Sequence, residues 1–162
     1  MAPVLVLCLG NDMRGDDGVG WAVAAALDAD PPPGVEVRRS AQAGFYLLDE
    51  LVGAGEAVVV DAIKTGRYPP GTVVEFAIEA LAAAPGPSPH AVGLPTVLDL
   101  GRRSGLDLPA RIDVVAIEIE DTGQVVEGLG LRARQAVPAA AAAVRRLAAA
   151  GVARRGTPEV AG

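Results

Sequence analysis

The sequence predicts a three-layer α/β fold, with helices on both faces of a mainly parallel, five-stranded sheet that includes one antiparallel strand. Short runs rich in valine and leucine alternate along the chain with longer segments whose apolar residues recur at helical spacing. Strands that alternate with helices favour parallel pairing, because a parallel neighbour needs a long crossover. The length of 162 residues leaves room for one domain with one core.

Five segments are predicted as strands. The almost wholly apolar runs at 3–9, 56–63 and 111–119 are typical of strands buried on both faces. The short segment 35–39 follows the break PPPG. The segment 72–78 follows the turn-rich KTGRYPPG, so we expect it to return as the antiparallel hairpin partner of 56–63.

Apolar periodicity and start signals predict four helices, at 18–29, 45–54, from about 88 to 105, and 131–150. Pro138 predicts a kink or a late start in the last of them. Trp21, Phe45 and Tyr46 lie on helical patterns, so we expect them to be core or packing residues rather than a stacking platform. The folded domain should span 1–150, and 151–162 should form a flexible tail.

The charge and residue counts exclude several classes of function. Twenty acidic and 14 basic residues give a net charge of −6, so a basic surface for nucleic acid or for an acidic membrane is not expected. No apolar run approaches the ~20 residues of a membrane-spanning helix. Cys8 has no second cysteine to pair with, and the chain starts without a secretory leader, so a cytoplasmic location is expected. One histidine excludes zinc motifs built on two or more.

In parallel sheets ligands bind beyond the carboxyl ends of the strands. Three aspartates lie at the ends of two predicted strands. Asp16 and Asp17 follow the first strand in LGNDMRGDDGVG. Asp16 suits an N-cap, and Asp17 would then stay ionised in the first turn of the helix. Asp61 ends an apolar strand, where burial costs several kcal/mol without a partner. The alternatives are that both aspartates of the first pair only cap the helix, and that Asp61 reaches solvent.

His90 is the third residue of interest. Ser88 can cap the third helix with Pro89 in its first position, which leaves His90 in the first turn, where a neutral imidazole is favoured. If the strands are parallel, Asp17, Asp61 and His90 converge at one edge of the sheet. Two carboxylates and an imidazole suit nickel, zinc or manganese. A surface or core histidine without a task is the alternative for His90.

Other catalytic motifs are missing from the sequence. No G-x-G-x-x-G follows the first strand directly, no Lys-Ser/Thr pair marks a phosphate loop, and no G-x-S-x-G marks a serine hydrolase. The position of Cys8 in the middle of a strand predicts a buried small hydrophobe rather than a nucleophile.

Four blocks in order, GNDMRGDDGVG, QAGFYLLDEL, VVVDAIKTGRYPPGTV and SPHAVGL, resemble the [NiFe]-hydrogenase maturation endopeptidases over roughly residues 4–147. The resemblance implies a monomeric α/β endopeptidase that removes the C-terminal peptide of a hydrogenase large-subunit precursor after nickel insertion. It also implies that the metal is bound by Asp17, Asp61 and His90. Asn11, Asp16 and Gly44 match loops that receive the substrate.

Some departures and alternatives remain open at this level. Cys8 stands where relatives usually carry a glycine, and Asp12 and Met13 replace a more apolar pair. The nickel could serve as a recognition signal, or it could polarise the scissile carbonyl or activate water. With the histidine coordinated, Asp17 or Asp61 is left as general base. The rival functions are a metal-dependent binding module or chaperone that does not cut, and a related peptidase with another peptide substrate.

Overall fold

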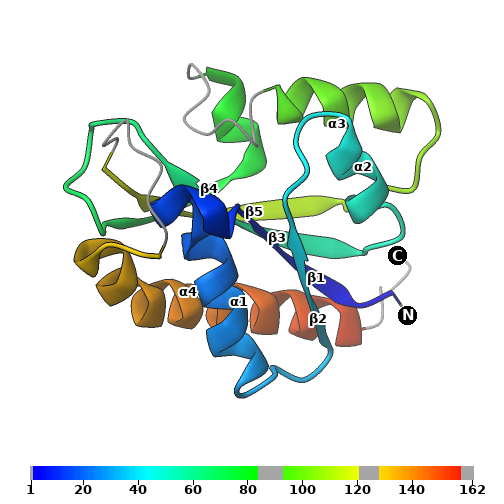
Figure 1. The fold of residues 1–162 in the computed structure, drawn as a ribbon. Coiled ribbons are helices and arrows are strands. Elements are labelled where there is room, and N and C mark those ends of the chain that lie inside the picture. Colours follow the sequence, from blue (N-terminus) through cyan, green and yellow to red (C-terminus); the bar gives the residue numbers. More distant parts are fainter. Residues whose placement is uncertain (1, 84–92, 121–127, 158–162) are drawn as a thin grey trace.

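The structure, a computed structural model, describes residues 2–83, 93–120 and 128–157. These residues form one five-stranded sheet between helices, as the sequence predicts (Figure 1). The strands lie in the order β2-β1-β3-β5-β4. They are β1 (Val4–Leu9), β2 (Val35–Ser40), β3 (Glu56–Ile63), β4 (Val73–Ala77) and β5 (Arg111–Glu118).

Four of the five strands run parallel. The strand β1 pairs with β2 on one side and with β3 on the other, and β3 pairs with β5 along all eight residues from Glu56↔Arg111 to Ile63↔Glu118. Parallel pairing brings the carboxyl ends of β1, β2, β3 and β5 to one side of the sheet, which we call the carboxyl edge. The opposite side, where these strands begin, is the amino edge.

The position of β4 corrects one prediction. This strand is antiparallel, but it pairs with β5 and not with β3 (register Val73↔Ile117 to Ala77↔Asp113). β5 occupies the place beside β3, so the connection from β3 passes the end of β5 before β4 begins. Two backbone hydrogen bonds join that connection to β5, from Gly71 to the Glu118 carbonyl (2.7 Å) and from Glu118 to the Thr72 carbonyl (2.9 Å). A short connection therefore predicted the direction of β4 but not its neighbour.

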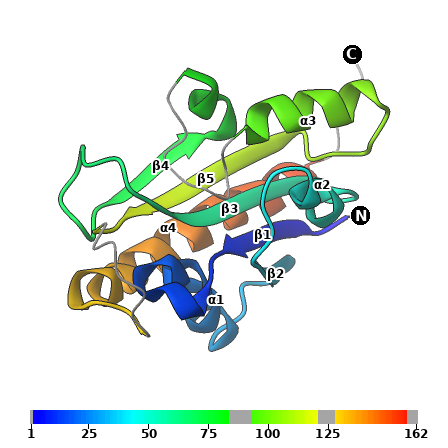
Figure 2. The same cartoon turned by 45° about the horizontal axis from the view of Figure 1, so that its top comes forward.

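Helices cover both faces of the sheet (Figure 2). On one face α1 and α4 bury a core of valines, isoleucines and alanines, and on the other face α2, α3 and η2 bury a core rich in leucine. Apolar residues on both faces explain why the central strands read as continuous apolar runs. The helical elements are η1 (Asp12–Gly18), α1 (Val19–Asp28), α2 (Tyr46–Leu51), η2 (Ile78–Ala83), α3 (Leu94–Arg103) and α4 (Leu131–Gly156).

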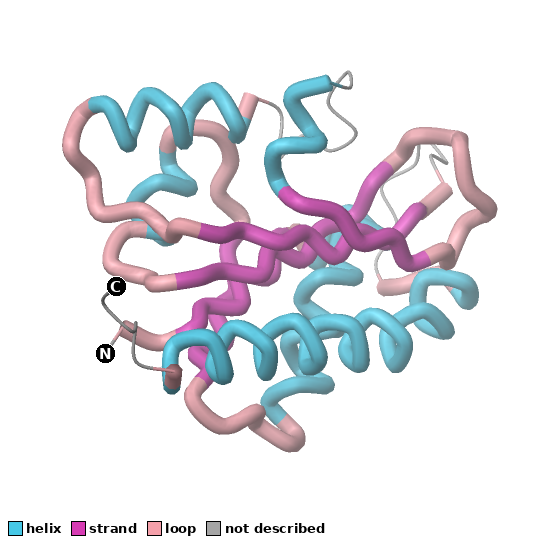
Figure 3. The backbone as a smooth tube through the Cα atoms, turned by 180° about the vertical axis from the view of Figure 1, so that it is seen from behind, coloured by secondary structure: helices cyan, strands magenta, loops and turns pink. Residues whose placement is uncertain are grey.

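The last helix is longer than predicted. α4 lies along one face of the sheet (Figure 3) and ends at Gly156, so residues 151–156 belong to a helix and not to a flexible tail. Arg154, near its end, pairs with Glu56 at 2.6 Å. α4 begins at Leu131, so Pro138 lies inside it and does not mark a late start. Its length and composition would suffice to cross a membrane, but its alanines pack in the core.

The helix α2 is shorter than predicted and presents its aromatic residues to solvent. Leu47, Leu48 and Leu51 face the core. Phe45 and Tyr46 are 62% and 68% exposed, so the prediction that they are core or packing residues is wrong. A helix of six residues has few positions that point inward, and leucines occupy them. Trp21 does pack: it is partly buried and its Nε1 lies 3.4 Å from the Ser40 carbonyl oxygen.

Candidate functional site at the carboxyl edge

The segments that leave β1, β2 and β3 are joined to one another at the carboxyl edge. Gly10, directly after β1, donates a backbone hydrogen bond to the Ser40 carbonyl at the end of β2 (3.0 Å). The backbone N–H of Asn11 donates a hydrogen bond to the Asp17 carbonyl oxygen (3.2 Å), which joins the two ends of η1. η1 in turn packs against β3. Gly20 allows α1 to approach closely, because a Cβ there would lie 2.2 Å from the Leu9 carbonyl oxygen.

Asp17 lies in η1, a 3₁₀ helix of seven residues, and is 8% exposed. α1 begins at Val19 with Gly18 as N-cap, so Asp17 precedes the helix and does not lie in its first turn as predicted. The Asp17 Oδ1 atom lies 3.9 Å from Lys64 Nζ. Runs of 3₁₀ helix longer than three or four residues are uncommon. The carboxylate thus faces a cation that follows β3.

Asp61 is the sixth residue of β3 and is 2% exposed. Its Oδ1 accepts a hydrogen bond from the backbone N–H of Ala62 (2.8 Å). The alternative that this carboxylate simply reaches solvent at the strand end is therefore wrong. Asp61 lies opposite Ala116 of β5. Lys64 follows Asp61 by three residues, so the ion pair between Lys64 and Asp17 connects η1 to the same end of β3. Both predicted aspartates lie at the carboxyl edge.

Asp16 has a different role from the predicted one. No side chain caps α1, and Asp16 Oδ1 instead accepts a hydrogen bond from the backbone N–H of Gly130 (2.6 Å), the N-cap residue of α4. The carboxylate satisfies a free donor at the start of that helix, where negative charge is favoured. Sequence spacing could not reveal this contact, because 114 residues separate the two partners.

Two residues of this edge were missed by the sequence analysis. Glu118, 2% exposed, accepts hydrogen bonds from Thr65 N (2.8 Å), Thr65 Oγ1 (2.7 Å) and Gly66 N (2.8 Å). It thereby holds the loop in which Lys64 faces Asp17. The signal was present, because Glu118 is a carboxylate in an apolar strand just as Asp61 is. Lys64 carries no comparable signal.

The third predicted ligand, His90, lies outside the described residues, as do Ser88 and Pro89. α3 begins at Leu94 with Gly93 as N-cap, later than the predicted start. Among residues 2–83, 93–120 and 128–157, no group of three His, Cys, Asp or Glu side chains could hold a metal ion. A metal site formed by Asp17, Asp61 and His90 therefore stays a prediction.

Cys8 behaves as predicted. It is fully buried in β1, and burial raises the pKa of its thiol to about 12. A thiol with such a pKa stays protonated at neutral pH, and a protonated thiol is a poor nucleophile. The only cysteine of the chain is thus a core residue.

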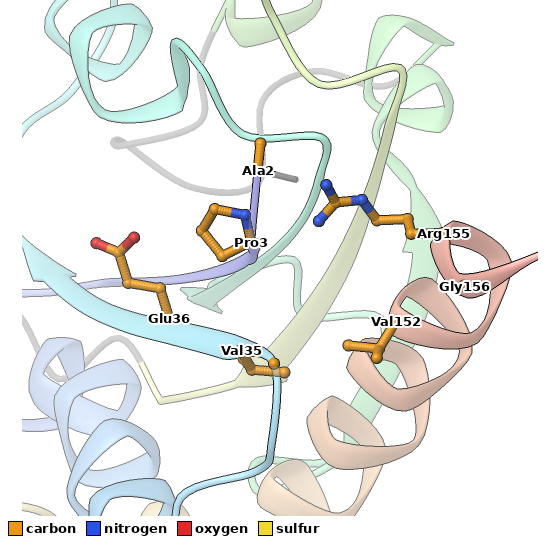
Figure 4. A pocket seen from close by; sticks show the side chains of 8 residues that line it. Ala2, Pro3, Val35, Glu36, Val152, Arg155 and Gly156 are labelled. Atoms are coloured by element: carbon orange, nitrogen blue, oxygen red, sulfur yellow. The ribbon is translucent and has the colours of Figure 1, made fainter.

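A pocket of about 620 Å³ lies at the other side of the sheet, at the amino edge (Figure 4). It is lined by residues that precede β1, begin β2 and end α4, and its two charged residues are Glu36 and Arg155. Neither Asp17 nor Asp61 lines it. Parallel α/β sheets bind ligands at the carboxyl ends of their strands, so this pocket is not the predicted site.

The fold and these residues define a class of protein: a three-layer α/β protein with two buried aspartates, Asp17 and Asp61, at the carboxyl edge of its parallel strands. The sequence of residues 23–147 matches the family model for hydrogenase maturation proteases, HycI. The match includes Asp61 and His90 and begins after Asp17.

Known proteins agree with this match. The hydrogenase 2 maturation protease of Escherichia coli strain K12 is 30% identical over 118 residues, which cover 70% of this chain and 71% of that protein. The hydrogenase maturating endopeptidase HybD from E. coli superimposes with a TM-score of 0.75 at 26% identity, covering 95% of this chain and 94% of HybD. HybD from Thermococcus kodakarensis, a [NiFe] hydrogenase maturation protease, has a TM-score of 0.70 at 26% identity, with coverages of 90% and 99%.

The chain belongs to the hydrogenase maturation protease family. It is accordingly a hydrolase, a maturation endopeptidase.

Proposed function

We propose that this protein removes the C-terminal extension of a [NiFe]-hydrogenase large-subunit precursor, and that it recognises the nickel already inserted in that substrate. Membership in the maturation protease family supports the reaction class. The observation that carries the proposal is the pair of buried carboxylates, Asp17 and Asp61, at the carboxyl edge. The enzyme would act as a monomer in the cytoplasm.

Asp17, Asp61 and His90 would contact the nickel of the precursor. Carboxylate oxygens and an imidazole nitrogen suit a borderline divalent ion. The two aspartates are positioned before the substrate arrives, since η1 packs on β3 and Asp61 accepts the N–H of Ala62 at 2.8 Å. Positioned ligands lose little conformational freedom on binding, which favours a substrate that carries the metal.

Lys64 provides the positive charge that Asp17 faces in the free protein. The 3.9 Å separation of Lys64 Nζ and Asp17 Oδ1 gives a weak ion pair, because the lysine side chain is 35% exposed. A divalent ion carries more charge than the ammonium group and would displace it. The lysine therefore balances the acidic site without a resident metal and yields to the metal-loaded substrate.

The carboxylates would also take part in cleavage. A metal beside the scissile bond can polarise the carbonyl or activate water, which lowers the barrier by several kcal/mol. With His90 coordinated, a carboxylate oxygen of Asp17 or Asp61 would accept the proton of the attacking water. Cys8 does not compete for the role of nucleophile, because its buried thiol has a pKa of about 12.

Cleavage of purified precursor tests the proposal. We expect the wild-type protein to cut nickel-loaded precursor and to leave nickel-free precursor intact, as measured by the mass of the large subunit. Asp17→Ala, Asp61→Ala and His90→Ala should each lower the rate at least ~100-fold. The control is Asp99→Ala, which removes an exposed carboxylate paired with Arg103 on α3.

Three results would contradict the proposal. Wild-type turnover by Asp61→Ala would exclude that carboxylate from the chemistry. Equal cleavage of nickel-loaded and nickel-free precursor would exclude recognition of the metal. Stable binding of the precursor without loss of the C-terminal peptide would instead indicate a binding module.

A further inference from the structure

The pocket at the amino edge has the size and the lining of a site for a small organic molecule. Its volume of about 620 Å³ falls within the range of roughly 300–1,000 Å³ that is usual for ligand sites. Three separate parts of the chain enclose it: the residues before β1, the start of β2 and the end of α4 (Figure 4). Most of its side chains are apolar and two are charged: Ala2, Pro3, Val35 and Val152 are apolar, Glu36 is acidic and Arg155 is basic.

The guanidinium group of Arg155 has no hydrogen-bond or ion-pair partner among residues 2–83, 93–120 and 128–157. The residue is half-buried, and its guanidinium points from α4 toward Ala2 and Pro3 (Figure 4). It lies against Gly55, where a Cβ would be only 2.9 Å from both Cζ and Nε of Arg155. Gly55 thus makes room for a cation to which no described residue supplies an acceptor.

The carboxylates near Arg155 are already held by other arginines. Three of them belong to β2, β3 and β5 close to the amino edge, and each accepts from its own arginine. The pairs are Glu36 with Arg38 (2.5 Å), Glu56 with Arg154 (2.6 Å) and Asp113 with Arg111 (2.9 Å). The positive charge of Arg155 is therefore left over at this edge, although the whole chain carries a net charge of −6.

An unpaired, half-buried guanidinium favours binding of an anion. Arginine stays protonated throughout the physiological pH range, so the group cannot become neutral. A charge that is partly removed from water is disfavoured unless an opposite charge compensates it. A carboxylate is a suitable partner, because its two oxygens match the planar N–H donors of the guanidinium.

We infer that the amino-edge pocket binds a small organic molecule with one carboxylate and an apolar body. Arg155 holds the carboxylate, and Val35 and Val152 contact the apolar part. This site lies on the opposite side of the sheet from Asp17 and Asp61, and the inference does not rest on the proposed function.

The other charged residue of the lining restricts the ligand further. Glu36 carries a negative charge, and its carboxylate points away from Arg155 (Figure 4). A ligand with several negative charges, such as a phosphate ester, would be repelled by Glu36 and would find one cation to compensate it. A single carboxylate on an apolar body meets the cation and covers apolar surface at the same time, which is the usual division of roles in ligand pockets.

The test titrates the full chain with octanoate, below its micelle concentration, by calorimetry and by amide NMR spectra. Two variants act on the cation in different ways. Arg155→Gln removes the charge, whereas Gly55→Ala keeps the charge and displaces the guanidinium, because the added Cβ occupies its place. Arg103→Gln is the matched control, since this arginine is 77% exposed on α3 and pairs with Asp99. Thermal denaturation checks that each variant is folded.

We expect octanoate to bind the wild type at one site and to shift the amide signals of Gly34, Val35 and Val152. Arg155→Gln should weaken binding about tenfold or more, and Gly55→Ala should weaken it to a smaller extent. Arg103→Gln should bind as the wild type does. Octan-1-ol and octylammonium, which have the same apolar body without the negative charge, should bind the wild type at least about tenfold more weakly.

Several results would overturn the inference. Absence of saturable octanoate binding would show that the pocket is not a site for such a ligand. Equal binding by Arg155→Gln and the wild type, or equal binding of octanoate and octan-1-ol, would exclude recognition of a carboxylate by Arg155. Inorganic phosphate that binds as tightly as octanoate would exclude a role for the apolar lining. Shifted amide signals away from the pocket would place octanoate elsewhere on the protein.

Discussion

The two edges of the sheet both carry acidic residues with little exposure, but their partners differ. At the amino edge Glu56 accepts from Arg154 at 2.6 Å, and Asp113 accepts from Arg111 at 2.9 and 3.2 Å. Each of these hydrogen bonds raises the pKa of the arginine. At the carboxyl edge Asp61 and Glu118 accept hydrogen bonds from backbone N–H groups, and Glu118 accepts another from the Thr65 hydroxyl.

This difference lies in the kind of group that holds each carboxylate. A bidentate arginine satisfies a carboxylate and leaves it little capacity to bind anything else. Backbone N–H groups hold a carboxylate in position without adding a mobile charge, and the Lys64 ammonium at 3.9 Å from Asp17 is a weak, displaceable partner. Hydrogen bonds from neighbouring backbone N–H groups thus hold Asp61 and Glu118 in position at the carboxyl edge.

The largest expected effect comes from exchanging one carboxylate at each edge for an amide. Asp61→Asn should lower the cleavage rate by ~100-fold or more, because the amide cannot bind the metal with a charge or accept a proton. Asp113→Asn weakens the pair with Arg111, so it should lower the melting temperature slightly and leave cleavage unchanged. Cleavage assays and thermal denaturation on both variants decide this. Loss of cleavage in Asp113→Asn would end the distinction between the edges.

The second prediction concerns the loop that Glu118 holds. Glu118→Gln keeps the shape but replaces an acceptor that receives three hydrogen bonds by an amide with one acceptor oxygen. We expect the free energy of unfolding in urea to fall by about 2 kcal/mol. Glu120→Gln is the control, since Glu120 is exposed and lies 3.8 Å from Arg132. Equal stability of the two variants would show that the buried carboxylate does not secure the loop.

The smallest effect is expected at Lys64. Lys64→Gln removes the cation that faces Asp17, so the purified protein should bind Ni²⁺ more tightly, by about fivefold or less, since exposed ion pairs contribute at most ~1 kcal/mol. Calorimetric titration with NiCl₂ in the absence of precursor measures this. Lys64→Arg, which keeps the charge, should match the wild type. An unchanged or weaker affinity in Lys64→Gln would mean that the lysine does not compete with the metal.

Local patterns in the sequence determined the layers and part of the site. The apolar runs predicted the strands, because a strand covered on both faces has no polar side to display. Asp61 stood out because a carboxylate in such a run is costly unless it has partners. The four motif blocks indicated the family that the comparisons confirm. His90 and its part in a metal site stay predictions.

Contacts between distant parts of the chain were decided only by the tertiary structure. The pairing of β4 with β5, the contact of Asp16 with Gly130, and the exposure of Phe45 and Tyr46 all contradict what local patterns predicted. In each case the outcome depends on whether a segment distant in the sequence packs against the residue or strand. Periodicity reports the environment that a residue prefers, whereas packing decides which neighbour provides it.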